Sequence, residues 1–333
     1  MGFQEISSVF FTAVVRVGLL VAMAVPGFIM QKAKKMPANA IAVMGAIIIY
    51  ISHPMLALYS FIEAEYSSEM LLNMGIAFVL AIIFNVGTLV IAKLIFLKDK
   101  DIPAAKVCTV GSALSNSGFL GIPVVKVLFN DPQITIYALM YMVVFNLVLW
   151  TFGVYIITGD KKYISLKKAF LNPSIIALCI GIPIFFMNLN LTANTNPAIQ
   201  AIMDFCRYFN NFNAPLSMLI MGVRLADIKF KEIFNNKRVY LTSLLKLIVF
   251  PLLALLLAWL ISLIPSFPID NKTITSIVVL VAMPTATLTM TLSEVFGGDN
   301  YTALKITLQS TLFSVITIPL FVTLLSVLGF VVL

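Results

Sequence analysis

The stretch that decides the fold is Ser115-Asn116-Ser117-Gly118-Phe119-Leu120-Gly121-Ile122-Pro123, which lies inside a long apolar segment. A second apolar segment is interrupted in a similar way by Met283-Pro284-Thr285-Ala286-Thr287. A helix broken at membrane depth leaves backbone N–H and C=O groups unpaired, and these groups are tolerated only where they line a cavity or bind something. Two such breaks at corresponding places in two halves of a chain are typical of the central site of a secondary transporter.

The composition of the chain is that of a membrane protein. Of its 333 residues, 61% are hydrophobic and 11% are charged, and the mean hydropathy is +1.04. These values lie far outside the range of soluble globular domains. The cysteines Cys108, Cys179 and Cys206 are scattered through apolar segments and indicate neither a disulfide framework nor a metal site. The first apolar segment is too long and too lightly charged at its start for a cleaved signal peptide. We expect no cofactor.

Ten apolar segments are each near or above the roughly 20 residues that a helix needs to cross a bilayer. The predicted spans are 6–30, 38–60, 69–97, 103–128, 133–158, 169–188, 198–225, 237–264, 272–296 and 300–331. The connections between them are short and leave no room for a separate soluble domain.

The distribution of charge predicts the orientation of these spans. Every second connection is rich in basic residues, and the alternate connections are mostly acidic. The basic set is Lys32, Lys34, Lys35, Lys98, Lys100, Lys106, Lys161, Lys162, Lys167, Lys168, Lys229, Lys231, Lys237 and Arg238. The alternate set is Glu63, Glu65, Glu69, Asp131 and Asp270, with a single Lys272. The positive-inside rule makes the lysine-rich connections cytoplasmic, so both termini are predicted to be extracytoplasmic in the cell membrane. The net charge of +8 is then a topology signal, and we expect no nucleic-acid partner.

The order of the spans predicts two inverted halves. Five is an odd number, so a second set of five spans enters the membrane from the opposite side. Pro123 and Pro284 lie 284 − 123 = 161 residues apart, close to the 169 − 6 = 163 residues between the starts of spans 1 and 6. The predicted fold is an all-α integral membrane protein in which ten transmembrane helices form two inverted five-helix repeats, with broken, crossing helices 4 and 9 as in sodium/proton antiporters. The first repeat is 1–158, the cytoplasmic connection is 159–168, and the second repeat is 169–333.

Several motifs resemble the auxin efflux carrier family, which includes bacterial malate permease-like proteins. They run in the family's order over nearly the whole chain. They are Asn116-Ser117-Gly118-Phe119-Leu120-Gly121-Ile122-Pro123, Asn172-Pro173-Ser174-Ile175-Ile176-Ala177, Pro215-Leu216-Ser217-Met218-Leu219-Ile220-Met221-Gly222-Val223-Arg224-Leu225, Lys246 with Pro251, Met283-Pro284-Thr285-Ala286-Thr287, Gly297-Gly298-Asp299 and Ser310-Thr311 with Pro319. The resemblance implies a carrier and a homodimer. The short 5–6 connection favours a small prokaryote-type member.

The two interruptions are the predicted substrate site. Pro123 is suited to start a second half-helix after a break through Gly118–Gly121, and Pro284 is suited to do the same after Met283. The start of a half-helix exposes N–H groups and a positive dipole end, which favour an anion. The predicted substrate-binding residues are Ser115, Asn116, Ser117, Gly118, Gly121, Pro123, Met283, Pro284, Thr285, Thr287 and His53. The alternative is that proline and glycine only kink packed helices, as they often do in membranes.

Several polar and ionisable residues lie within the predicted spans. His53, the only histidine, could carry a proton or contact an anion, or it could be an interfacial residue with no transport role. Arg16 and Lys246 are candidates for charge compensation, although Arg16 could equally snorkel or meet a carboxylate. Asp204 is the candidate for a proton-linked carboxylate, unless it only pairs with Arg207 three residues on. Further expectations are that Lys126 and Glu294 snorkel to membrane surfaces and that Asn85 and Asn146 hydrogen-bond between helices.

Neither interruption contains an Asp or a Glu, which argues against a cation as the main cargo. We therefore expect a transporter of a small organic anion, such as malate or an auxin-like weak acid, that works by alternating access between a scaffold of spans 1, 2, 6 and 7 and a unit that contains spans 4 and 9. The coupling ion stays open. The alternatives are a sodium-coupled organic anion transporter like the bile-acid symporters and a membrane receptor that does not transport. The sequence lacks His-Glu-x-x-His, paired intramembrane aspartates and an obvious nucleophile with a base, so we do not expect an enzyme.

Overall fold

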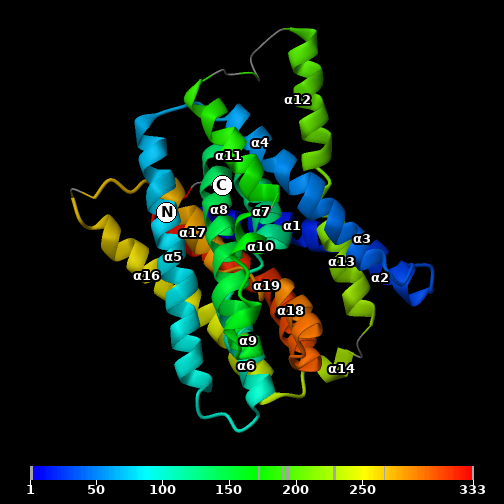
Figure 1. Cartoon of the computed structure of the whole chain (residues 1–333). Helices are drawn as coiled ribbons and strands as arrows, with labels where there is room; N and C mark the ends of the chain where they lie inside the picture. Colours follow the sequence, from blue (N-terminus) through cyan, green and yellow to red (C-terminus); the bar gives the residue numbers. More distant parts are fainter. Residues whose placement is uncertain are drawn as a thin grey trace.

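A computed structural model describes residues 3–171, 173–188, 191, 196–227, 230–265 and 267–331. Asn172 and Lys229, to which the sequence analysis refers, lie outside the described residues, as does the side chain of Lys168. The first half contains α1 (Phe3–Ala22), α2 (Ala24–Lys32), α3 (Ala40–Ile47), α4 (His53–Glu63), α5 (Ser68–Phe96), α6 (Ile102–Ala113), α7 (Ile122–Phe129), α8 (Pro132–Val148) and α9 (Val154–Thr158) (Figure 1). The second half contains α10 (Leu166–Phe170), α11 (Pro173–Phe186), α12 (Pro197–Asn210), α13 (Asn213–Ala226), α14 (Phe230–Ile233), α15 (Lys237–Leu244), α16 (Phe250–Ser262), α17 (Asn271–Val281), α18 (Leu288–Phe296) and α19 (Asn300–Val327).

Six helices among the described residues are long and apolar enough to cross a membrane. They are Gln4–Lys32, Ala40–Glu63, Ser68–Phe96, Pro132–Thr158, Lys237–Ser262 and Asn300–Val327, and they correspond to predicted spans 1, 2, 3, 5, 8 and 10. Predicted spans 4, 7 and 9 are divided into shorter helices, because residues 114–116, 211–212 and 282–287 interrupt them. Span 6 is represented by the shorter apolar helix Ile175–Phe186. The arrangement as ten spans in two inverted repeats therefore stays a prediction.

Several of the long helices contain a short π-helical turn. These turns are η1 (Ile48–Ser52), η2 (Ser117–Gly121), η3 (Leu149–Gly153) and η6 (Leu245–Val249), and a 3-10 turn, η4 (Lys161–Tyr163), lies in the 5–6 connection. Pro54 follows η1 and Pro251 follows η6. A proline has no N–H to donate to the preceding turn, which allows that turn to widen. Three of these four π-turns, η1, η2 and η3, contribute residues to the cavity described below.

Several helices begin directly after a residue whose side chain caps them. The carboxylates of Asp101, Asp131, Asp270 and Asp299 accept hydrogen bonds from backbone N–H groups in the first turns of α6, α8, α17 and α19. Such caps satisfy N–H groups that have no partner within the helix, and a negative charge is favourable at that end. These four capping residues therefore fix the positions at which α6, α8, α17 and α19 begin.

The packing brings the two broken segments to the centre. Helix α2 packs against α13 and α4 packs against α11 and α12, whereas α8 packs against α5 and α17. Helix α1 packs against α19. Figure 1 shows the ends of α6, α9, α14 and α18 gathered at one end of the molecule, and α12 projecting at the other. The connection between α5 and α6, which contains Lys98 and Lys100, also lies at the first of these ends.

The contact between α2 and α13 depends on two glycines. A Cβ built on Gly222 would lie 1.9 Å from the carbonyl oxygen of Ala24 and 2.8 Å from the backbone nitrogen of Phe28. A Cβ on Gly27 would lie 2.4 Å from the carbonyl oxygen of Leu219. The two backbones therefore touch directly, in the manner of small-residue interfaces between membrane helices.

We expect Gly222→Ala to lower stability by about 1 to 3 kcal/mol, because the added methyl group meets backbone atoms that cannot turn aside. Thermal unfolding of the purified protein in detergent measures the change. Gly75→Ala on α5 is the matched control, since a Cβ there meets nothing within 4 Å. Equal melting temperatures for the two variants would contradict this account of the α2–α13 contact.

An ion pair fixes the start of α15 against the connection between α5 and α6. The guanidinium of Arg238 donates from Nε to Asp99 Oδ2 at 2.6 Å and from Nη2 to Asp99 Oδ1 at 2.8 Å. It also approaches Asp101 Oδ2 at 3.3 Å. The hydrogen bonds from Arg238, with a further one from the backbone of Asp101, lower the pKa of Asp99 below its ordinary value of 3.8. This contact aligns the helix that carries Lys246 with the first broken segment.

We expect Asp99→Asn to lower the apparent melting temperature at pH 7 by a few degrees. A carboxylate with a lowered pKa contributes stability above its unfolded pKa, and this contribution disappears as the pH falls through the folded pKa. The difference between wild type and Asp99→Asn should therefore shrink below about pH 4. Melting temperatures between pH 7 and pH 3 test this, with Glu65→Gln, an exposed carboxylate, as the control. A difference that stays constant with pH would rule out the ion pair as its source.

Candidate functional site

The two interrupted segments meet and pair through their backbones. Ser115 and Thr285 form an isolated antiparallel β-bridge. The N–H of Asn116 donates to the carbonyl of Pro284 at 2.8 Å, and the N–H of Ala286 donates to the carbonyl of Leu114 at 3.0 Å. Each break thus satisfies the backbone groups that the other break leaves unpaired.

The breaks do not begin where the sequence analysis expected. The first break lies at residues 114–116, and Gly118–Gly121, predicted to be unwound, belong to the π-helical turn η2. These glycines allow close approach instead: a Cβ on Gly121 would lie 2.6 Å from Leu280 Cδ2. Pro123 lies in the first turn of α7, as expected. Pro284 does not start a half-helix, because it lies in the extended segment and α18 begins at Leu288.

Buried polar groups surround the place where residues 114–116 and 284–286 pair, which we call the crossing. The ammonium of Lys246, a residue with no exposed surface, donates to Ser115 Oγ at 2.6 Å and to the carbonyl of Val281 at 2.8 Å. Thr285 Oγ1 donates to the carbonyl of Gly111 at 2.8 Å, and the N–H of Thr285 donates to Ser310 Oγ at 3.1 Å. The crossing is therefore anchored from α19 and from the span that contains η6.

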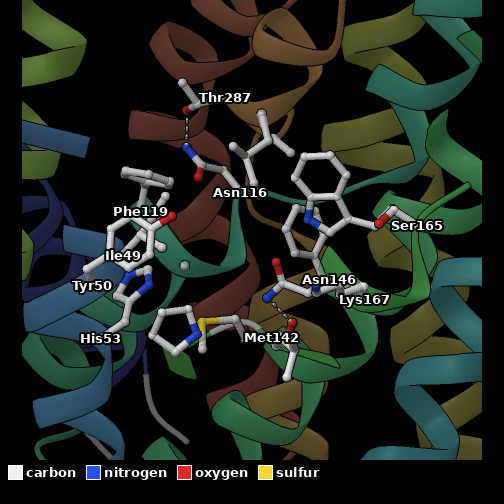
Figure 2. A pocket seen from close by; sticks show the side chains of 17 residues that line it. Ile49, Tyr50, His53, Asn116, Phe119, Met142, Asn146, Ser165, Lys167 and Thr287 are labelled. Carbon is white, nitrogen blue, oxygen red and sulfur yellow. Dashed lines mark hydrogen bonds between the residues drawn. The ribbon is translucent and has the colours of Figure 1, made fainter. Parts of the chain in front are cut away.

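A cavity of about 570 Å³ opens beside the crossing (Figure 2). Its size falls within the range of small-molecule sites. Both broken segments contribute to its wall, together with residues around η1, from α8 and η3, and from the start of predicted span 6. The lining residues are Ile49, Tyr50, His53, Asn116, Gly118, Phe119, Met142, Phe145, Asn146, Trp150, Ser165, Lys167, Leu171, Pro173, Ala286, Thr287 and Leu288.

Two helix starts meet at this cavity. Asn116 precedes η2 and Thr287 precedes α18, and Asn116 Nδ2 donates to Thr287 Oγ1 at 3.0 Å (Figure 2). The first N–H groups of a helix have no partner within it, and this end of the helix dipole is positive. Phe119 and Leu288, which belong to these first turns, line the cavity. No Asp or Glu occurs among the described lining residues. Some of these N–H groups are already paired: that of Ser117 donates to the carbonyl of Ser115, and those of Thr289 and Met290 donate to the carbonyls of Ala286 and Thr287. The two helix starts therefore present the positive ends of their dipoles to the cavity without a carboxylate.

His53 lies in the same wall. Its side chain is 5% exposed, and its ring meets the ring of Phe119 edge-on at 5.9 Å between centroids. The Nε2 atom is buried and has no hydrogen-bond partner in the described part of the chain. Figure 2 shows His53 beside Tyr50 at the rim of the cavity. A buried nitrogen without a partner is costly, so a ligand that supplies one would be favoured here.

The predicted substrate-binding residues fall into two groups. Asn116, Gly118, Thr287 and His53 line the cavity. The others belong to the crossing or pack behind it, and they are Ser115, Ser117, Gly121, Pro123, Met283, Pro284 and Thr285. The backbone or side chain of each is buried within the protein. Substrate contact stays a prediction for all eleven residues.

The other ionisable candidates, Arg16 and Asp204, bind partners outside the cavity. The guanidinium of Arg16 donates to the carbonyls of Val127 and Leu128 at the end of α7. The carboxylate of Asp204 pairs with Arg207 at 2.7 Å on the surface of α12. Neither Arg16 nor Asp204 lines the cavity. The Asp204–Arg207 contact matches the structural alternative, and charge compensation by Arg16 and proton coupling by Asp204 stay predictions.

Several cavity residues were not found from the sequence. Asn146 was expected to bond between helices, but its Nδ2 donates to the carbonyl of Met142 on its own helix at 2.9 Å, and the side chain lines the cavity. Asn85 likewise donates to its own helix, at the carbonyl of Ala81. Trp150 and Lys167 also line the cavity. The available signal for Asn146 was an amide in the middle of span 5, whereas Trp150 and Lys167 carried none.

No group of three His, Cys, Asp or Glu side chains that could hold a metal ion occurs among the described residues. A comparison with curated proteins finds no match to the chain. A family model described as membrane transport protein matches residues 9–322 and confirms the resemblance seen in the motifs. The chain therefore belongs to the membrane transport protein family, the family of the auxin efflux carriers.

Proposed function

We propose that this membrane transporter moves a small organic anion across the cell membrane by alternating access. The observation that carries the proposal is the meeting of two helix starts at one cavity, joined by the Asn116–Thr287 hydrogen bond at 3.0 Å. Positive dipole ends that are fixed before binding are suited to a carboxylate. The buried ammonium of Lys246 directly behind Ser115 adds positive charge to the same region.

The walls of the cavity favour an anion with an apolar body. Beyond the crossing, the lining includes Phe119, Phe145, Trp150 and Leu171. A second carboxylate, as in malate, would lose hydration wherever it meets these apolar groups. Lys167 is the one described cation in the lining, and it is exposed. Of the two classes expected from the sequence, an auxin-like monocarboxylate therefore fits the lining better than a dicarboxylate.

The position of the cavity supports an inward-facing state. Its lining runs from the crossing to Ser165 and Lys167, which belong to the predicted cytoplasmic connection. In the proposed cycle the ten spans form two inverted repeats, spans 1, 2, 6 and 7 form the scaffold, and the unit with spans 4 and 9 moves past it. The termini would then face outside.

Charged residues lie at both ends of the proposed boundary between the scaffold and the moving unit, and they support such a cycle. At one end, the ammonium of Lys126 on α7 lies 5.9 Å from the ring centroid of Tyr59 on α4, and Glu63 follows Tyr59 by one turn. At the other end, Arg224 on α13 contacts Met290 Sδ at 3.5 Å on α18. Contacts of this kind can be exchanged as one unit slides along the other.

Two other functions remain as alternatives. A sodium-coupled organic anion transporter would require several oxygen ligands for the ion, and sodium-dependent flux would favour it. A membrane receptor would bind the anion without moving it. Substrate-dependent flux into liposomes distinguishes a transporter from such a receptor. The proposal assigns no catalytic chemistry to the chain.

We expect Asn116→Ala to reduce uptake of a labelled aromatic monocarboxylate, such as indole-3-acetate, into proteoliposomes. Losing the amide that orients Thr287 should weaken the apparent affinity by about tenfold, the usual order for one hydrogen bond to a charged group. Asn85→Ala is the matched control, because it removes a buried amide that does not line the cavity. Undiminished transport by Asn116→Ala at saturating and sub-saturating substrate would rule out its role, and faster uptake of malate than of the monocarboxylate would overturn the substrate preference.

We expect Lys246→Met to fold but to lose most of the thermal stabilisation by the anion. Removal of a positive charge from a low-dielectric region should weaken binding of an anion there by about tenfold or more. Lys305→Met is the control: Lys305 is also buried, at 4% exposed, but its ammonium donates to Asn235 away from the crossing. Thermal shifts with and without the anion measure the effect. An equal loss in both variants would mean that Lys246 acts only on folding.

A further inference from the structure

We propose that a second site, in a cleft between the ends of α5, α6 and α9, binds the phosphate headgroup of an anionic phospholipid. The cleft has a volume of about 250 Å³ and does not share residues with the cavity at the crossing. Lys93, Lys106 and Tyr155 supply its cationic and hydroxyl groups. The site does not depend on which substrate the protein carries.

The two lysines of the cleft are not neutralised by the acidic residues around it. Neither Lys93 nor Lys106 has a carboxylate within ion-pair distance among the described residues. Asp99, which also lines the cleft, is held by two hydrogen bonds from Arg238, and Asp160 pairs with Lys162. The cleft therefore keeps a local excess of positive charge.

The ammonium of Lys106 is already directed toward the cleft wall. It donates to the carbonyl of Ile157 at 3.3 Å, near the left-handed Gly159 that ends α9. An ammonium carries three N–H donors, so this contact leaves donors for a phosphate. Lys106 is half-buried, which weakens the screening of its charge by solvent.

The surroundings of the cleft fit a lipid rather than a free anion. Leu94, Leu97 and Ile102, on the helices that form the cleft, are 65%, 65% and 62% exposed. Exposed side chains of this kind suit contact with acyl chains. The cleft also lies at the end of the molecule where the ends of α6 and α9 lie together, next to the α5–α6 connection that contains Lys98 and Lys100 (Figure 1). A cationic pocket between transmembrane helices at this level is typical of sites for anionic headgroups.

Lipid binding to the purified full chain tests the proposal. Short-chain phosphatidylglycerol, phosphatidylcholine, glycerol phosphate and inorganic phosphate are titrated separately, with native mass spectrometry and thermal shift as readouts. We expect phosphatidylglycerol alone to bind tightly and to raise the melting temperature. Lys93→Gln/Lys106→Gln should weaken its binding by about 30-fold, the value for two lysines near a membrane surface. Lys93→Arg/Lys106→Arg should bind it nearly as well as wild type, and this variant also shows that the site tolerates substitution.

Lys34→Gln/Lys35→Gln is the matched control, since it removes the same charge from an exposed connection that is also predicted to be cytoplasmic. An equal loss in this control would replace the proposed site by a general attraction to negative surfaces. Equal binding of inorganic phosphate and phosphatidylglycerol would replace a lipid site by an anion site. Equal binding of phosphatidylcholine, or no loss in the Gln variant, would overturn the proposal. Transport of the organic anion is measured separately and does not affect these outcomes.

Discussion

The backbone pairing between residues 114–116 and residues 284–286 is the interaction on which the rest of the site depends. Two helices stop in the middle of the molecule, and each supplies one N–H and one C=O to the other. Without this exchange, both breaks would leave buried polar groups unpaired in an apolar environment. With it, two short helices can start at the same point, and the side chains at those starts can share one cavity.

The charges around the crossing follow the polarity of the helices. Lys246 donates to the carbonyl of Val281 at the end of α17, and Arg16 donates to carbonyls at the end of α7. Cations are favourable at these C-terminal ends, where carbonyl groups have no partner within the helix. The start of α18 and the η2 turn that precedes α7 line the cavity instead. Lys246 and Arg16 thus contact the C-terminal ends of α17 and α7, whereas the helix starts face the cavity in which we propose that the anion binds.

The sequence predicted the centre of the molecule better than its edges. Paired interruptions rich in Ser, Asn, Thr and Pro indicated the crossing, because few other arrangements tolerate such residues in apolar segments. The register within each break could not be predicted, since Gly118 and Gly121 serve equally for unwinding and for close packing. Only the neighbouring side chains, such as Leu280 beside Gly121, distinguish these roles.

The cavity wall was harder to predict for a related reason. Asn116, Thr287 and His53 are polar and stand out in apolar segments. Trp150 is apolar and lies in a long apolar span, where facing a cavity and facing lipid leave the same pattern. Which face of a span is enclosed depends on helix rotation, and hydropathy that is high all around a helix does not specify rotation.

The crossing also constrains how the chain can be made. Asn116 and its partner Thr287 are 171 residues apart, so the first break is synthesised long before the second. During that interval Leu114 and Asn116 lack the backbone partners that they have in the finished protein. Until the second break is synthesised, the helix of the first half is incomplete. Its unpaired backbone groups must then contact water, lipid headgroups or the insertion machinery. Assembly of the centre therefore requires nearly the whole chain, because a chain that ends before residue 284 lacks the backbone partners of Leu114 and Asn116.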